Sequence, residues 1–477
     1  MDGFIIRPVI RSSSFRHALV SALILIGLMV LILAPRPLYG WLNLQTAHAR
    51  EFQGDLPGAA SAYAEAAERI PWQPVLWEQA GEAAFSAGEI KDSIVYFQMA
   101  EGHAALSQAG WMVFAKAYQL SGDTGAAIAA WKRALPQASA YESLAEIYRQ
   151  QGNLSAAMEN WRALIALDAN NANAHYQLGL LLTATSPEQA LPELMSAARL
   201  DSKLDVSVQS LRTSLNTALL SDDRAYQLTV SGTALGALGD WDLAGKAFRQ
   251  ATGLNPGYAD AWAWLGESEQ HGGQDGLVDL QKAILLDPGS AMVQDLYGIY
   301  WQRQGQTTQA QAAFQRATEI EPENAGWQAA LGSAYEQSGD LVAALEHYNL
   351  AVTLSPQDAS MWRALAEFSL NNGVDVAGTG LPAAQKLLAL APGDWQSNDL
   401  AGLAAFETSN FAESEQLFLK AIQIAPDQAA PHEHLGLAYL QTGERAPAYE
   451  QLIQATSLDP NGVYGDQAQR LLEQNYP

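Results

Sequence analysis

The sequence contains no cysteine among its 477 residues. Disulfide bonds, thiolate metal sites and cysteine nucleophiles are therefore excluded, and the chain is compatible with an oxidising compartment. Basic residues are scarce: 26 Lys and Arg stand against 51 Asp and Glu, which gives a formal net charge of −25. Because such a negative field repels polynucleotides and anionic lipid headgroups, we expect no nucleic-acid partner.

Low-complexity segments are also lacking, and only one long uncharged apolar run occurs. Residues 18–34 read ALVSALILIGLMVLILA, 17 residues without a charged side chain. As a helix rising about 1.5 Å per residue, this run reaches about 25 Å, the lower limit for crossing a bilayer. The three arginines before it predict a cytoplasmic N-terminus at residues 1–17, with everything after Pro37 on the other side of the membrane.

We interpret residues 18–34 as an uncleaved transmembrane signal anchor in the cytoplasmic membrane. The alternative is a secretory signal that is removed by cleavage, which would make the protein a secreted one. Pro35 follows directly after the small residue Ala34, and the triplet Ala47-His48-Ala49 lies too far downstream for a cleavage site. Both observations favour the anchor.

The remainder of the chain is periodic. Seven prolines recur at intervals of 32, 34, 34, 36, 34 and 34 residues: Pro256, Pro288, Pro322, Pro356, Pro392, Pro426 and Pro460. A fixed interval within about 20–50 residues is typical of stacked supersecondary units that form a solenoid. A solenoid provides an extended surface for partners.

Alignment on the prolines reveals the rest of the repeat. The last full unit, Ala429 to Pro460, has Leu at position 7, Gly at 8, Tyr at 11 and Ala at 20 and 27. This pattern resembles the tetratricopeptide repeat, a helix–turn–helix unit of about 34 residues. Units begin near residues 40, 74, 108, 138, 172, 225, 259, 291, 325, 359, 395 and 429. The resemblance implies an all-α, right-handed α-solenoid of about twelve helical hairpins.

Packing explains the small residues in each unit. We expect position 8, which is Gly or Ala throughout, to face Ala at position 20 where the two helices of a hairpin approach each other, with larger groups at 7, 11 and 24 filling the space between units. Pairs such as Gly122-Asp123 and Gly339-Asp340 predict the turns, because glycine accepts a left-handed conformation and Asp caps the next helix. Proline at position 32 blocks continuation of the second helix.

These boundaries predict a domain organisation. We expect a short cytoplasmic segment (1–17), the anchor (18–34), a first block of about five repeats (40–204), an extra linking helix (205–224), a second block of about seven repeats (225–462) and a capping helix (463–477). A terminal cap is needed because the last repeat would otherwise expose its apolar face.

Catalytic motifs are weak. His432 and His434 stand at i and i+2, which places them on different faces of a helix, and they lack the i, i+4 spacing of a zinc-binding helix. Gly232-x-x-x-Gly236 does not follow a strand, so we interpret it as a helix contact and not a phosphate loop. Carboxylate pairs such as Glu142/Glu146 could serve a glycosidase, but they recur from unit to unit, which indicates a surface property. We therefore expect no enzyme, no cofactor and no metal site.

The resemblance also implies where partners bind. In tetratricopeptide arrays, positions 2, 5, 9, 12 and 13 of the first helix line the concave groove. Carboxylates dominate these positions here, and no repeat pair holds the basic clamp by which chaperone-adaptor members bind an acidic C-terminus. The candidate partner-binding residues are Glu78, Glu82, Lys116, Glu142, Glu146, Arg149, Glu267, Asp295, Glu336, Arg363 and Glu367. Two interpretations stay open: a merely solvated surface, or a groove for basic or polar extended segments of proteins or peptides.

Three functions compete. The first is a membrane-anchored, non-catalytic scaffold that holds partner proteins in an envelope-associated complex. The second is a peptide-binding chaperone or assembly factor for secreted or envelope proteins. The third is a role with glycosyltransferases: repeat-bearing enzymes of that class need a separate nucleotide-sugar-binding region after the array, so here we expect at most a non-catalytic accessory.

Overall fold

The computed structural model describes residues 20–24, 35–104 and 106–476. These ranges contain helices and turns and no β-strand, as expected for an all-α chain. The chain divides into two compact units: Met1–Leu182 with Glu188–Arg212, and Thr183–Pro187 with Thr213–Pro477. The predicted anchor, residues 18–34, lies largely outside the described residues, and none of the described helices is both long and apolar enough to cross a membrane.

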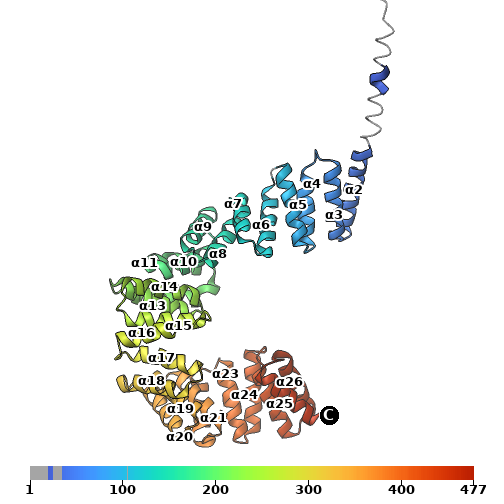
Figure 1. The fold of residues 1–477 in the computed structure, drawn as a ribbon. Coiled ribbons are helices and arrows are strands. Elements are labelled where there is room, and N and C mark those ends of the chain that lie inside the picture. Colours follow the sequence, from blue (N-terminus) through green and yellow to red (C-terminus); the bar gives the residue numbers. More distant parts are fainter. Residues whose placement is uncertain (1–19, 25–34, 105, 477) are drawn as a thin grey trace, which may run out of the picture. The chain divides into compact units, whose positions relative to one another are not determined.

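The first unit is a series of antiparallel helix pairs (Figure 1). Its helices are α2 (Pro35–Phe52), α3 (Leu56–Arg69), α4 (Val75–Ser86), α5 (Ile90–His103), α6 (Gln108–Ser121), α7 (Thr124–Ala134), α8 (Ala138–Gln150), α9 (Leu154–Leu167), most of α10 (Ala172–Thr185), and α11 (Pro187–Leu200). A short 3₁₀ turn, η1 (Ser202–Leu204), leads into α12 (Asp205–Ala218), which runs on into the second unit.

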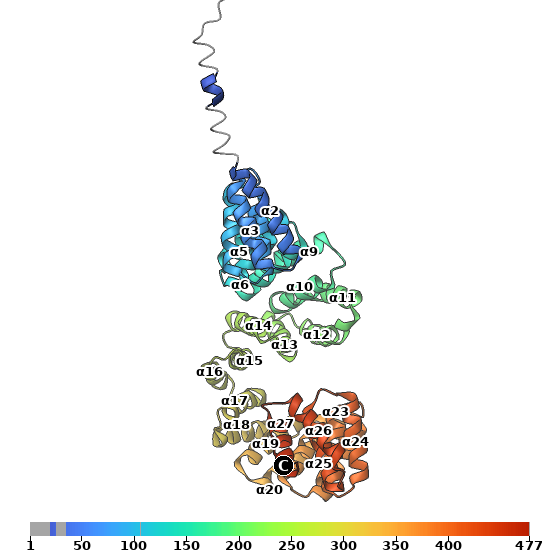
Figure 2. The same cartoon turned by 90° about the vertical axis from the view of Figure 1, so that its right-hand side faces the viewer.

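The second unit continues the same pattern (Figure 2). Its helices are α13 (Arg224–Ala237), α14 (Trp241–Leu254), α15 (Ala259–His271), α16 (Leu277–Leu286), α17 (Ala291–Arg303), α18 (Thr307–Ile320), α19 (Ala325–Ser338), α20 (Leu341–Leu354), α21 (Ala359–Asn372), the π-helical η2 (Val376–Gly380), α22 (Leu381–Leu390), α23 (Trp395–Glu407), α24 (Phe411–Ile424), α25 (Ala429–Thr442), α26 (Arg445–Leu458) and α27 (Val463–Asn475).

The turns within the pairs follow the predicted chemistry. Gly122 and Gly339 have φ values of 82° and 83°, a left-handed conformation that glycine adopts without steric cost. Asp123 then accepts a hydrogen bond from the backbone N–H of Ala126, and Asp340 caps α20 in the same way. Both pairs are therefore closed by a glycine that ends the first helix and an acidic cap that begins the second.

The position that faces the small residue of each pair differs from the prediction. Position 20 was expected opposite position 8, but the nearest side chain is the large one at position 24. A Cβ on Gly298 would lie 2.6 Å from the Phe314 ring, and one on Gly402 would lie 2.7 Å from Phe418. At these two positions glycine is therefore required, because the aromatic ring of the second helix lies so close to the glycine backbone that a side chain would collide with it.

The prolines at position 32 end the second helices as predicted, and they have an additional role. The helices stop two residues before each proline, and the proline carbonyl then accepts a hydrogen bond from the residue six positions later. Trp262 Nε1 donates to Pro256 O at 2.9 Å, and Trp362 Nε1 donates to Pro356 O at 3.0 Å. Gln294, Gln328, Asn398 and His432 make the equivalent contact in their units. Position 4 therefore fastens each loop to the following helix.

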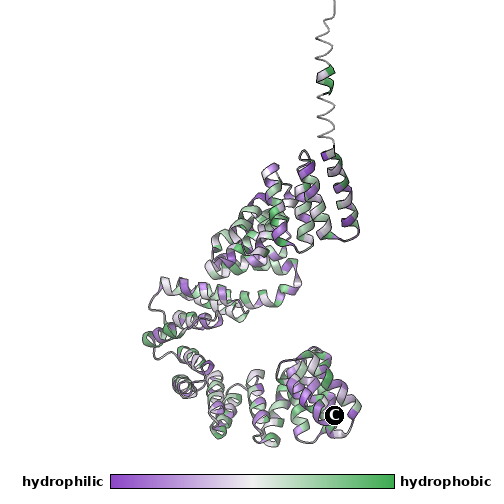
Figure 3. Ribbon diagram, turned by 45° about the vertical axis from the view of Figure 1, so that its right-hand side comes forward, coloured by the Kyte–Doolittle hydropathy of each residue, from purple (hydrophilic) through white to green (hydrophobic). Residues whose placement is uncertain are grey.

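The pairs bury many alanines together with larger side chains such as Trp131, Trp161 and Phe418, and polar and apolar residues share each helix (Figure 3). The C-terminal end is closed by α27, whose Ala468 and Leu472 pack on Leu452 and Ala455 of α26. This contact covers apolar surface that the last repeat would otherwise expose to water.

Candidate partner-binding surface

The candidate residues all lie on the first helix of a pair. They are distributed over α4, α6 and α8 in the first unit and over α15, α17, α19 and α21 in the second. The polar groups at these positions fall into two classes. Some are held by the next repeat, and others accept no hydrogen bond from the described residues.

Glu78 belongs to the first class. Its side chain is 8% exposed, and its carboxylate accepts hydrogen bonds from the backbone N–H (3.1 Å) and the hydroxyl of Ser107. Ser107 is the N-cap of α6, where the orphan amides and the helix dipole favour a negative charge. A side chain on Gly110 would collide with this carboxylate, so the glycine makes room for it. Glu78 therefore ties α4 to the following repeat.

Helix α8 makes similar ties to α10. Asn173 Nδ2 donates to Glu142 Oε1 at 3.1 Å, and Arg149 Nη1 donates to Gln177 Oε1 at 3.0 Å. Both contacts span about one repeat length, 31 and 28 residues. They hold consecutive first helices together along their polar faces.

Glu82 and Glu146 belong to the second class, since neither accepts a hydrogen bond from the described part of the chain. Burial raises the pKa of Glu82, and the neighbouring Glu78 and Glu51 charges raise it further. Burial and then the Glu142 charge raise the pKa of Glu146, against an opposing effect of Arg149. Both carboxylates are therefore under-compensated, and a cation brought to them would be stabilised. The candidate Lys116 on α6 is exposed.

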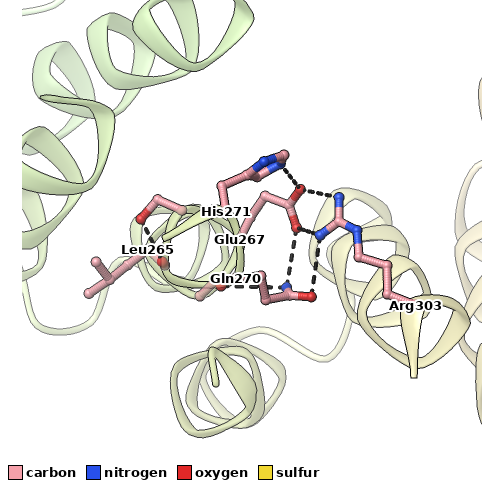
Figure 4. A network of polar contacts seen from close by, with 7 residues as sticks. Leu265, Glu267, Gln270, His271 and Arg303 are labelled. Carbon is pink, nitrogen blue, oxygen red and sulfur yellow. Dashed lines mark hydrogen bonds and ion pairs between the residues drawn. The ribbon is translucent and has the colours of Figure 1, made fainter. Parts of the chain in front are cut away.

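The second unit contains the most developed polar network (Figure 4). Glu267 is 4% exposed, and Arg303 of α17 holds its two oxygens with two N–H···O bonds of 2.7 Å. His271 Nε2 lies 3.1 Å from the same carboxylate, and Gln270 Nε2 donates to it at 3.3 Å. A bidentate guanidinium–carboxylate pair is among the strongest polar contacts in proteins. Glu267 is consequently an internal link between repeats.

Asp295 lies beside this network and has a different environment. Its side chain is 8% exposed, and it accepts no hydrogen bond from the described residues. Burial raises its pKa to about 7, with a further contribution from the Glu267 charge. A carboxyl group in this position is neutral for part of the physiological pH range, and it lacks a donor.

Helices α19 and α21 bring Glu336, Arg363 and Glu367 together. Tyr348 Oη and Asn372 Nδ2 donate to Glu336 at 2.9 and 2.6 Å, and Arg363 Nη2 donates to Asp394 Oδ2 at 2.8 Å. Glu367 is half-buried, and its pKa is raised by burial against the opposing effect of Arg363. Only Glu367 of these three lacks a hydrogen bond among the described residues.

The two histidines of the His432-Glu433-His434 segment contact different elements, as their spacing predicts. His432 lies 2.7 Å from Gln451 Oε1, whereas His434 Nδ1 lies 2.9 Å from Asp399 Oδ1 on α23. Burial alone lowers the pKa of His434, but the Asp399 carboxylate and then Glu433 outweigh it and raise the pKa to about 9. This is a buried ion pair between repeats. Within the described ranges, no group of three or more His, Asp or Glu side chains is arranged to hold a metal ion.

These polar contacts between neighbouring repeats were not predicted from the sequence. Their partners are separated by 28 to 36 residues, close to the proline interval. Polar pairs at that separation are the signal that would have identified them, since residues one period apart occupy equivalent places on neighbouring helices.

Family comparisons agree with this geometry. Tetratricopeptide-repeat models match residues 145–185, 230–275, 300–359, 379–429 and 431–461. The chain is a tetratricopeptide-repeat protein. No curated protein sequence matches it.

Solved structures with a related arrangement are distant in sequence. The APC/C hetero-tetramer Cut9–Hcn1 is 15% identical over 91% of this chain and 95% of that chain, with a TM-score of 0.42. Yeast Tom70 is 16% identical over 92% and 95%, with a TM-score of 0.40. YrrB, described as a TPR protein with an unusual peptide-binding site, is 17% identical over 40% and 97%, with a TM-score of 0.33.

Proposed function

We propose that this tetratricopeptide-repeat array is a non-catalytic scaffold that binds basic, extended segments of partner proteins along the first helices of its pairs. The observation that carries the proposal is the set of under-compensated carboxylates at groove positions. Glu82, Glu146 and Glu367 each have a pKa raised first by burial, and none accepts a hydrogen bond from the described residues. A basic partner supplies the missing cations.

The proposal includes a membrane location. The uncharged run at residues 18–34 and the arginines before it support an anchor in the cytoplasmic membrane, with the array on the extracytoplasmic side. A scaffold in this place gathers its partners at the membrane surface.

The binding test uses three groove substitutions in the first unit. Glu82→Gln, Glu142→Gln and Glu146→Gln keep side-chain size and remove three charges. Each exposed ion pair contributes about 0.2–1 kcal/mol, so the triple variant should bind partners more weakly by about 0.6–3 kcal/mol. Partner capture after crosslinking in intact cells, quantified against the parent chain, measures the loss. Glu78 is left unchanged because both of its oxygens accept hydrogen bonds from Ser107, whereas the amide oxygen introduced by Glu142→Gln can still accept the hydrogen bond from Asn173.

The matched control removes the same charge elsewhere. Glu68, Glu101 and Glu159 are exposed residues on the second helices α3, α5 and α9, and their replacement by Gln should leave capture unchanged. Equal capture by the groove variant and the parent would show that the groove carboxylates are only solvated surface. A few stoichiometric partners support a scaffold, whereas a broad set of newly made clients would favour a chaperone.

A further inference from the structure

The first helix of the array carries an apolar face that no other described element covers. Helix α2 packs on α3 through Gly40, Leu44 and Ala47, which are buried and lie at i, i+4 and i+7 on one side. On the other side, Leu38, Trp41 and Leu42 share a face at i, i+3 and i+4. They are 61%, 50% and 48% exposed. A helix that is apolar on both faces has a second surface to bury.

Helix α2 is also unusually long. It has 18 residues, whereas the α-helices from α3 to α27 have 10 to 14. The repeat register places its first position at residue 40, and α2 begins at Pro35, five residues earlier. These five residues extend the helix by about 7.5 Å past the start that the other repeats use. Leu38 and Tyr39 lie on this extension.

Two more exposed apolar residues lie at the same end of the first pair. A Cβ on Gly40 would contact Ile70 at 2.8 Å, so the start of α2 lies against the end of α3. Trp72 lies in the loop after Ile70 and Val75 begins α4, and the two residues are 62% and 54% exposed. Together with Leu38, Tyr39, Trp41 and Leu42, they form what we term the N-terminal patch.

The composition of the N-terminal patch and its place in the chain indicate its occupant. Tryptophan and tyrosine are enriched where proteins meet the headgroup region of a bilayer, because an apolar ring with one polar atom suits both phases. The exposed Arg36 and the partly exposed Arg69 flank the patch in an otherwise acidic protein. The uncharged run at residues 18–34 ends one residue before α2 begins.

We propose that the N-terminal patch lies in the interfacial layer of the bilayer, so that the first repeat rests on the membrane and does not hang from a free linker. The proposal depends on the membrane location proposed above. The proposal defines the position of the first repeat relative to the bilayer surface. The start of α2 contacts lipid headgroups, and the other end of α2, at Phe52, does not.

The absence of cysteine makes a direct test possible. In the full chain, Leu42→Cys gives a single site for an environment-sensitive fluorophore. Phe52→Cys is the matched control, because Phe52 lies at the other end of α2 and is 94% exposed. Each labelled protein is reconstituted into vesicles of phosphatidylethanolamine and phosphatidylglycerol that carry a nitroxide quencher on the headgroup. Ten residues of helix separate the two sites by about 15 Å, so we expect quenching at residue 42 to be about threefold stronger or more. Leu38→Cys should behave like Leu42→Cys, and unchanged helical circular dichroism confirms that the variants are folded.

Flotation of the vesicles distinguishes a failure of the proposed interfacial patch from a failure of the proposed anchor. If the protein floats with the vesicles but residues 42 and 52 are quenched equally, the interfacial patch is wrong while the anchor stands. If the protein does not float, both proposals are wrong. If the probe at residue 42 is shielded in detergent solution and transfers energy to a labelled second copy, the occupant is another molecule of this chain and the lipid assignment is overturned.

Discussion

At some positions of the repeat, the packing leaves room for only one kind of side chain. The glycine at position 8 is one such place, because the residue at position 24 covers its backbone. The distance from a hypothetical Cβ to that residue varies between repeats, from 2.5 Å at Gly232 and 2.6 Å at Gly298 to 3.3 Å at Gly332. The cost of adding a methyl group should follow this distance.

We therefore expect Gly298→Ala to destabilise its repeat more than Gly332→Ala does. The first substitution forces Phe314 to move, an over-packing cost of about 1–3 kcal/mol. The second leaves the Tyr348 ring in tight contact and benefits from the better helix propensity of alanine. Hydrogen exchange should locate the loss near α17 and α18, since repeats contact mainly their neighbours. Equal effects of the two substitutions, or loss spread over all repeats, would contradict this packing.

The pKa of Asp295 predicts a pH-dependent stability. Its pKa is raised from 3.8 to about 7, so the folded state keeps a proton that the unfolded state loses above pH 3.8. As the pH rises from about 4 to 7, this residue increasingly destabilises the fold, and above pH 7 the penalty is constant. Asp295→Asn should therefore match the parent near pH 4 and be more stable at pH 8, by up to about 4 kcal/mol at about 1.4 kcal/mol per pKa unit. Thermal melts at both pH values measure the difference, and a variant that is less stable than the parent at pH 8 would refute the assignment.

His434 predicts the opposite trend. Its folded pKa of about 9 lies above the ordinary value of 6.5, so its pairing with Asp399 stabilises the fold fully below pH 6.5 and is lost as the pH rises toward 9. The parent chain should lose protection from hydrogen exchange around α23 and α25 between pH 7 and about 9. In His434→Gln this loss should be absent, because the variant already lacks the ion pair. An identical pH profile in both chains would exclude the pairing.

At the scale of helices and turns, much of the structure could be predicted from the sequence. From the second repeat onward, first helices begin within one residue of the expected starts, because glycine turns, acidic caps and prolines define the ends by local chemistry. The extension of α2 could not be predicted, since it lies before the repeat register begins. The contact between position 8 of the first helix and position 24 of the second could not be predicted either, because it depends on how the two helices pack against each other.

The candidate surface was less predictable for the same reason. Sequence placed Glu78, Glu82 and Glu267 alike at groove positions, but their environments differ. Glu78 and Glu267 are bound by Ser107 and Arg303 of neighbouring repeats, whereas Glu82 accepts no hydrogen bond from the described residues. Which carboxylate finds a partner depends on side chains one repeat away, and a single-repeat pattern does not contain that information.

The capping helix α27 offers a test at this scale. Leu472 packs on Leu452 and Ala455 of α26, and its truncation to alanine should cost about 2–4 kcal/mol, because a large-to-small change leaves a cavity. The effect should appear as faster hydrogen exchange in α25 to α27. Tyr464→Ala on the same helix is a comparison at a more exposed site and should cost less. If Leu472→Ala left exchange in α26 unchanged, α27 would not act as a cap.

In the whole molecule as we propose it, a membrane anchor precedes the repeat array. Protease added to right-side-out spheroplasts should degrade the array and spare a tag at the N-terminus, because the topology that we propose from the arginines before residue 18 has that end in the cytoplasm. Protection of the array from the protease would contradict the proposed topology.

The account also predicts how binding responds to salt. Because the proposed contacts are partly exposed ion pairs spread over several repeats, affinity should fall smoothly as the Debye length shortens to about 3 Å near 1 M salt. Partner binding that is unchanged between low and high salt would exclude the acidic surface as the main source of affinity.

The most direct test of the central claim is site-specific photo-crosslinking in intact cells. A photoreactive residue at Lys116 or Glu146, on first helices, is compared with one at Val342 or Leu285, which are 80% and 83% exposed on the second helices α20 and α16. The account predicts that the first-helix positions crosslink to a small set of proteins, through segments rich in Lys and Arg, and that the second-helix positions do not. Crosslinks that arise only from the second-helix positions, or that map to acidic or apolar segments, would contradict it.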